Sequence, residues 1–158
     1  MQPRPVSRSH AVLVHSLGPT DANSVGFVHG GVIMKLCDEV AAIAGVRHSG
    51  GRVVTAGMDR MTFNERIEIG ELLTLRASVN AVWHTSMEIG VRVEAERPAI
   101  GESRHTNTAF LTMVAVDDDG RPRRVPPLVS ETEDEHRREA AAQTRRRNRL
   151  AEREEILG

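Results

Sequence analysis

Hydrophobic residues recur at two different spacings along the chain, and the first of these is helical. From about residue 30 to residue 48 apolar side chains repeat at the interval of one helix face. Arg47 and His48 fall in the last turn and Gly50-Gly51 follow, which is typical of a helix end. Many residues of the segment are small, so the pattern predicts a slim helix that packs closely against a sheet. The small residues are Ala41, Ala42, Ala44 and Gly45.

The second spacing is that of β-strands. In residues 74–79 and 88–93 polar and apolar residues alternate, as they do in antiparallel strands with one buried face. A single helix followed by a run of strands favours an α+β fold over a repeated βαβ arrangement. The predicted strands are residues 11–15, 52–61, 72–82, 87–96 and 106–116.

Both ends of the chain differ from this middle part. Residues 1–10 are polar and contain Pro3 and Pro5, which predicts a flexible N-terminus before a domain over residues 11–128. Over residues 129–158 Glu and Arg alternate with alanines, which favours a charged and solvated C-terminal helix. Arg145-Arg146-Arg147 could contact nucleic acid, but their acidic neighbours favour the solvated helix.

The composition is that of one ordinary domain. With 158 residues and a net charge of -1, the chain has room for one core and gives no global sign of a nucleic-acid or membrane partner. No apolar run reaches the roughly 18 residues of a membrane span, and no apolar leader is present, so we expect a cytoplasmic protein. The single cysteine allows no intramolecular disulfide. Aromatic residues are few, so oligomerisation is an expected way to bury more surface.

The predicted helix begins at a glycine pair and carries a carboxylate. Gly30 and Gly31 have no Cβ, so a ligand can approach the backbone, and the free N–H groups of the first turn can bind an oxyanion. Asp38, two turns later, is a candidate general base or nucleophile. The alternatives are that the glycines only permit a tight turn and that Asp38 caps a loop or pairs with an arginine. Glu39 lies about 100° further round the helix and cannot share the face of Asp38.

Several motifs in a fixed order include this site. The first is Asn23-x-x-Gly26-x-x-His29-Gly30-Gly31-x-x-Met34-Lys35-x-x-Asp38-Glu39. The later ones are Val54-Thr55-Ala56 with Asp59-Arg60, then Thr85-Ser86-Met87-Glu88, Thr112-Met113-Val114-Ala115-Val116-Asp117, Gly120-Arg121-Pro122 and Val125-Pro126-Pro127. Over roughly residues 11–128 these motifs resemble the hotdog-fold acyl-CoA thioesterases, in the branch of the cytosolic acyl-CoA hydrolases.

The resemblance implies a fold, a reaction and an assembly. A hotdog fold is a curved antiparallel sheet wrapped around one central helix. The implied reaction is hydrolysis of fatty acyl-CoA to a free fatty acid and coenzyme A, with no metal and no cofactor beyond the substrate's own CoA. The family assigns the catalytic carboxylate to Asp38 and pairs it with Asn23 of a neighbouring hotdog unit, so a single-domain chain would form its site between subunits. Family members also suggest a hexamer built as a trimer of dimers.

Further residues are expected to contact the substrate. Phe27 replaces a residue that is polar in many relatives, so it could alter acyl specificity, and His29 lies at the glycine turn, where a structural hydrogen bond is the alternative. Arg60 and Arg66 are candidate partners for the CoA phosphates. Thr85-Ser86 lie on a turn similar to the family's CoA-side loop. The histidines show no metal-ligand spacing.

Two other functions are compatible with a hotdog fold. One is a regulator that binds acyl-CoA without hydrolysing it, although neither end of this chain resembles a DNA-binding module. The other is an enoyl-CoA hydratase or dehydratase that acts on the β-carbon. Those enzymes resemble a different arrangement of a catalytic His with an Asp or Glu.

Overall fold

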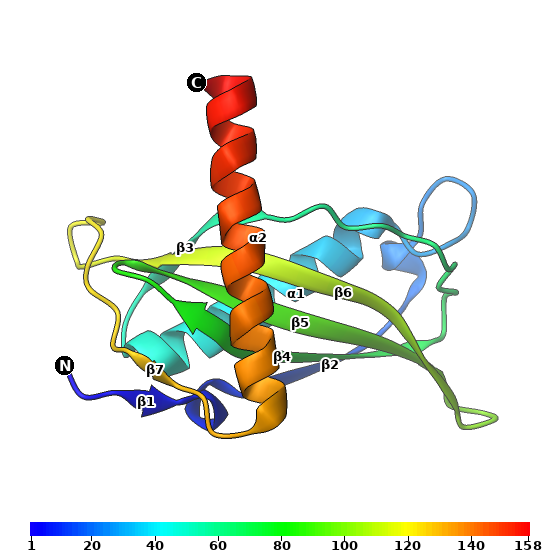
Figure 1. Ribbon diagram of the computed structural model, residues 1–158. Coiled ribbons are helices and arrows are strands. Elements are labelled where there is room, and N and C mark those ends of the chain that lie inside the picture. Colours follow the sequence, from blue (N-terminus) through cyan, green and yellow to red (C-terminus); the bar gives the residue numbers. More distant parts are fainter.

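The computed structural model describes all 158 residues and is built around one five-stranded antiparallel sheet (Figure 1). The spatial order of its strands is β2-β4-β5-β6-β3. Their bounds are β2 Ala11–Ser16, β3 Val53–Met58, β4 Leu72–Val82, β5 Ser86–Arg97 and β6 Glu102–Ala115. A separate parallel pair joins β1 and β7, and two long helices and two short 3-10 helices complete the chain. The bounds of these strands and helices, with η for a 3-10 helix, are β1 Arg4–Pro5, β7 Leu128–Val129, α1 Gly30–Ser49, α2 Glu133–Leu157, η1 Val6–Ser9 and η2 Pro19–Asp21.

The predicted α+β hotdog fold is confirmed. The sheet curls around α1, and each predicted strand and the predicted helix are present with small shifts at their ends (Figure 1). The largest difference is at β6, which begins at Glu102 and not at residue 106. Residues 102–105 pair with residues 94–97 of β5 across a register shift, and polar residues on both strands hide the apolar alternation there.

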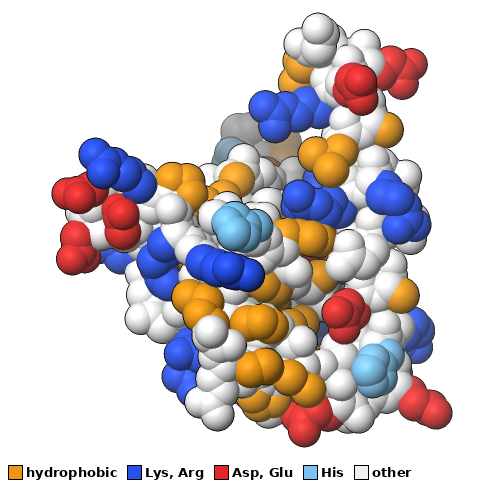
Figure 2. Space-filling model, turned by 60° about the vertical axis from the view of Figure 1, so that its left-hand side comes forward, with side chains coloured by type: hydrophobic (Ala, Val, Ile, Leu, Met, Phe, Trp, Pro, Cys, Tyr) orange, Lys and Arg blue, Asp and Glu red, His pale blue; other side chains and the backbone are white.

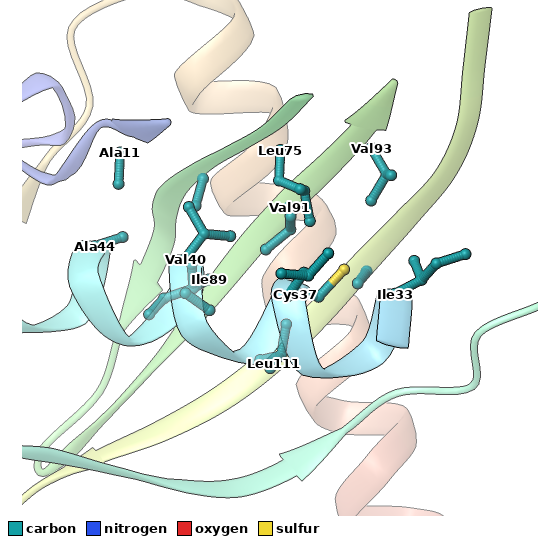
Figure 3. Close-up of a cluster of buried hydrophobic side chains, with 14 of the residues drawn as sticks. Ala11, Ile33, Cys37, Val40, Ala44, Leu75, Ile89, Val91, Val93 and Leu111 are labelled. Atoms are coloured by element: carbon teal, nitrogen blue, oxygen red, sulfur yellow. The ribbon is translucent and has the colours of Figure 1, made fainter. Parts of the chain in front are cut away.

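Helix α1 packs its apolar side into the curve of the sheet. Figure 3 shows Ile33, Cys37, Val40 and Ala44 of α1 facing side chains of the sheet. Small residues allow the close approach that the sequence suggested: a Cβ added to Gly45 would lie 3.2 Å from Cδ1 of Ile89. The sheet side of this core includes Leu75, Ile89, Val91, Val93 and Leu111, all essentially without solvent exposure.

Helix α2 crosses the opposite face of the sheet and extends past its edge (Figure 1). Along β5, Ile89 faces α1 while the neighbouring Glu88 faces α2 and is fully buried. Arg145 Nη2 donates to Glu88 Oε1 at 2.6 Å, and Arg149 Nη1 donates to Glu88 Oε2 at 3.2 Å. The expectation of a merely solvated helix is therefore wrong for this part of α2, because its arginines find a buried carboxylate on the sheet. The protruding end, residues 151–158, carries charged side chains beside the exposed hydrophobic Ile156 and Leu157 (Figure 2).

The first ten residues also differ from the expected flexible lead-in. Residues 4–5 pair with β7, and residues 6–9 form η1 with Val6 and Ser9 buried. Ser9 Oγ accepts a hydrogen bond from the N–H of Val79 at 2.9 Å, and Arg4 Nη1 donates to the carbonyl of His48 at the end of α1. Polar side chains of this segment form hydrogen bonds with backbone groups of the folded chain. The amino-acid composition alone does not reveal these bonds, so it predicted a flexible segment. None of the helices is both long and apolar enough to cross a bilayer.

Candidate active site

The start of α1 is a tight, capped turn. The ring of His29 is the N-cap, and its Nδ1 accepts a hydrogen bond from the N–H of Gly31 at 3.0 Å. The N–H of Gly30 has no partner within the chain. Phe63 packs its ring over Gly30, where an added Cβ would lie 3.5 Å from ring carbons. Of the two predicted oxyanion donors, only the Gly30 N–H is thus free, because the ring of His29 uses the other.

Asp38 lies two turns further along α1 and is half-buried. Its Oδ1 accepts a hydrogen bond from Thr55 Oγ1 at 2.5 Å, and the same hydroxyl lies 3.4 Å from Sδ of Met113. Thr55 belongs to β3, the strand at one edge of the sheet. Sequence reasoning did not assign Thr55 to the site, although it lies in the Val54-Thr55-Ala56 motif. Proximity of β3 to the middle of α1 could not be seen without the fold.

Helix α1 and strand β3 carry several partly exposed hydrophobic side chains. Four large hydrophobic side chains of these two elements have between 40% and 50% of their area exposed. They are Met34, Ile43, Val46 and Val54. Asp38 is half-buried and accepts a hydrogen bond from Thr55, whereas Glu39 is exposed and its carboxylate has no hydrogen-bond partner.

Asn23 holds the loop before α1. Its Oδ1 accepts hydrogen bonds from the N–H groups of Val25 and Phe27, both at 3.1 Å, so the carbonyl of the side chain closes its own turn. The expected alternative role of Asn23 in its own turn is thus present. The Nδ2 group makes no hydrogen bond within the chain and remains available as a donor.

The chain does not bring Asn23, Gly30 and Asp38 together at one point. Asp38 lies about 12 Å along α1 from Gly30, at roughly 1.5 Å per residue. The Asn23 carbonyl is tied to the loop that precedes the helix. Any site that uses all three groups therefore needs the corresponding residues of a second chain.

The other predicted substrate residues lie in three separate places. Arg66 places its guanidinium 4.6 Å from the centre of the Phe27 ring, beside the start of α1. Arg60 pairs with Glu152 of α2 at 2.8 Å on the outer face. Thr85-Ser86 lie at the turn between β4 and β5, where the carbonyl of Thr85 accepts from Ala115 near the C-terminal end of α1. Since the 20 residues of α1 span about 30 Å, this turn is far from Gly30 of the same chain.

Cys37 is next to Asp38 but points into the core. It is fully buried, and burial raises the pKa of its thiol to about 12. A neutral, buried thiol is neither a nucleophile nor a metal ligand at neutral pH. No group of three or more His, Cys, Asp and Glu side chains is close enough to hold a metal ion.

Comparison with known proteins identifies relatives over the whole site. Residues 25–102 match the Thioesterase superfamily. A cytosolic acyl coenzyme A thioester hydrolase of Mus musculus is 42% identical over 140 residues, which cover 87% of this chain and 36% of that protein. The chain thus spans about a third of the length of this relative.

Two solved structures agree with the fold along almost the entire chain. An acyl-CoA hydrolase of Staphylococcus aureus in complex with butyryl coenzyme A and coenzyme A has a TM-score of 0.88 and 32% identity, covering 96% of this chain and 93% of that one. Further structures of the S. aureus hydrolase carry alanine at one Asp, one Asn or one Thr. An apo hexameric acyl-CoA thioesterase has a TM-score of 0.91 and 37% identity, covering 96% of this chain and 97% of that one. The protein therefore belongs to the hotdog-fold acyl-CoA thioester hydrolases of the thioesterase superfamily.

Proposed function

We propose that this protein hydrolyses fatty acyl-CoA to a free fatty acid and coenzyme A, with Asp38 as general base or nucleophile. The observation that carries the proposal is the hydrogen bond from Thr55 to the half-buried Asp38. Thr55 fixes one carboxylate oxygen, which leaves the other free to take a proton from water or to attack the thioester carbon.

The remaining groups fit the needs of thioester cleavage. Attack on the carbonyl carbon places a negative charge on its oxygen, and the unpartnered N–H of Gly30 can donate to that oxygen. The C–S bond then breaks, and the coenzyme A sulfur leaves as a thiolate that takes up a proton. The free Nδ2 of Asn23 can orient the water or the thioester oxygen without competing for the proton.

Each active site is proposed to join two subunits. Asn23 and Gly30 of one chain would meet Asp38 of another, and the partly exposed Met34, one helical turn before Asp38, would be covered by the partner. The alanine variants of the S. aureus hydrolase support this choice of residues. Its substituted Asn, Asp and Thr are separated by the same numbers of residues as Asn23, Asp38 and Thr55 here. A trimer of such dimers would match the hexameric neighbour, and a cytoplasmic location would match the name of the mouse relative.

The decisive experiment follows release of coenzyme A with a thiol-reactive dye, using acyl-CoAs of increasing chain length. Asp38→Asn keeps the size of the side chain, and we expect turnover to fall about a hundred- to ten-thousand-fold. Glu39→Gln is the matched control, because the neighbouring carboxylate has no hydrogen-bond partner and should be dispensable. If the wild-type protein binds acyl-CoA tightly but releases no thiol, the function is that of a ligand-binding regulator and the proposal is wrong.

A mixing experiment tests the shared site. Asn23→Ala and Asp38→Ala proteins are each expected to be inactive, but subunit exchange between them would create some intact sites. Activity should then rise toward about a quarter of the wild-type value when the two variants exchange freely into dimers, as expected for random pairing of isologous subunits. Exchange that is demonstrated by mass without any recovered turnover would exclude a site built from two chains.

A further inference from the structure

The loop between β3 and β4 covers the start of α1. Phe63 in this loop packs its ring over Gly30 while leaving 44% of its area exposed, and Arg66 stacks on the ring of Phe27. The ring of Phe63 therefore lies against Gly30, whose N–H has no partner within the chain. The chemistry proposed above uses this N–H but gives no role to Phe63.

Arg104 of β6 anchors this loop. Its guanidinium donates to Glu65 Oε2 at 3.2 Å and to the carbonyl of Arg66 at 2.9 Å, which belong to consecutive residues of the loop. It also donates to both oxygens of Glu71, at 2.5 and 3.1 Å. Glu71 is almost completely buried, and the hydrogen bonds from Arg104 hold the pKa of its carboxyl below the usual value. Arg104 is therefore fixed on a buried partner and can in turn fix the loop.

A second anchor lies on the other side of Phe63. Asn107 Nδ2, also on β6, donates to the carbonyl of Thr62 at 2.5 Å. Phe63 is thus held between Thr62 and Glu65, each bonded to a side chain of β6. Two hydrogen bonds from β6 therefore fix the loop on both sides of Phe63. A phenylalanine that only contacted solvent would not need its loop to be held in this way.

We propose that Phe63 is the wall that shields the Gly30 N–H from water in the thioester site, and that Arg104 is the positioning residue that holds Phe63 in place. A backbone donor stabilises a developing oxyanion more strongly where water is excluded, because solvent competes for the donor and screens the charge. The proposal rests on the proposed thioesterase function for its catalytic part. Its structural part, the control of Phe63 by Arg104, does not depend on turnover.

The structural part can be measured by fluorescence on the full chain. Phe63→Trp in a Trp83→Phe background leaves one tryptophan, the reporter at the wall, since Trp83 is the only tryptophan in the sequence. Adding Arg104→Ala should raise quenching of this reporter by acrylamide several-fold, and Arg104→Lys should restore only part of the protection, because lysine lacks the bidentate fork. Arg92→Ala is the matched control. Arg92 and Glu94 form an exposed ion pair, and both lie on β5, the strand next to β6. Equal quenching with and without Arg104 would overturn the positioning role.

The catalytic part is tested by comparing the changes in kcat and in KM. Phe63→Ala is expected to lower kcat about tenfold with a smaller change in KM, because shielding acts on the transition state more than on binding. Phe63→Leu, which keeps an apolar wall, should recover most of kcat. Arg104→Ala should reproduce the kcat loss of Phe63→Ala, and the two substitutions combined should cost no more than one. Additive losses, or a loss confined to KM, would contradict the proposal.

The two parts fail in distinguishable ways. If the wild-type protein shows no hydrolysis, the thioesterase function is wrong, but the quenching data still test Arg104. If hydrolysis is present and saturating coenzyme A changes neither the emission nor the quenching of the reporter tryptophan, the ligand does not reach this wall and the role of Phe63 is wrong.

Discussion

The two long helices lie on opposite faces of the same sheet and are held there by different forces. Helix α1 contacts the sheet through apolar and small side chains, while α2 contacts it through arginines bonded to the buried Glu88 and to Asp59. Arg145 and Arg146 of α2 also stack on Phe110 and Trp83, at 3.7 and 4.3 Å from the ring centres. The apolar α1 interface should lose stability wherever a substitution removes side-chain volume. The stability of the α2 interface should depend instead on whether each buried charge keeps a partner of opposite charge.

The largest expected effect removes volume from the α1 interface. Leu75→Ala should lower the free energy of unfolding by about 2–5 kcal/mol, because Leu75 is fully buried and its neighbours can close only part of the cavity. Denaturant unfolding measures the difference. Leu150→Ala makes the same chemical change on an exposed position of α2 and should cost far less. Similar losses from the two substitutions would mean that α2 is buried much more deeply than its surroundings in one chain indicate.

The next effect removes a charge from the α2 interface. Arg145→Ala takes away the bidentate partner of Glu88 and should cost about 2–3 kcal/mol, since a buried carboxylate loses its strongest hydrogen bonds. Arg147→Ala, an exposed arginine on the same helix, is the control. Adding Glu88→Gln to Arg145→Ala should recover part of the loss, because the single bond from Arg149 at 3.2 Å compensates the buried charge only in part and a neutral amide needs less compensation. No recovery in the double variant would show that packing of Arg145 on Phe110 dominates.

A smaller effect distinguishes the interfaces by pH. His48 at the end of α1 is fully buried, and its Nε2 lies 2.8 Å from the carbonyl of Pro126. Burial lowers the pKa of His48 below 6.5, with Arg4 and Arg8 acting in the same direction. The unfolded chain then binds a proton that the folded chain does not, so stability should fall as the pH drops below about 6.5 and be unaffected by His48 above it. His48→Gln should flatten this part of a stability-against-pH curve, and an unchanged slope would assign the effect to another group.

The smallest effect concerns the protruding end of α2. Residues 151–158 are exposed, and the ion pair between Arg60 and Glu152 joins two largely solvated side chains. Glu152→Ala should change the free energy of unfolding by less than about 1 kcal/mol. A larger loss, if it depends on protein concentration, would show that this end contacts another subunit.

The apolar packing of α1 could be predicted from the sequence, whereas the ionic packing of α2 could not. The apolar spacing of residues 30–48 and 72–82 predicted α1 and β4 within one residue of their bounds, because burial of one face imposes a period on the sequence. The docking of α2 was missed, since Glu88 on an apolar strand and arginines on a polar helix give no periodic signal. Their pairing becomes visible only when β5 and α2 cross.

The same limit applies to the candidate site. Asp38 and the glycine pair could be named as candidates because they lie in one helical segment that resembles a family motif, and their catalytic roles stay predictions. Thr55, Phe63 and Arg104 come from other strands and loops, and their relation to Asp38 or Gly30 depends on tertiary contacts. Whether Asn23 meets Asp38 depends on a second chain, which makes the mixing experiment the appropriate test.

The buried thiol of Cys37 has a practical consequence for all of these measurements. With a pKa of about 12 and no solvent exposure, the only sulfhydryl of the chain stays silent toward a colorimetric reagent as long as the fold is intact. Every thiol detected in the hydrolysis assay would then come from coenzyme A, without a background from the enzyme. The same reagent, applied during denaturation and without substrate, would count unfolded molecules, one label per chain.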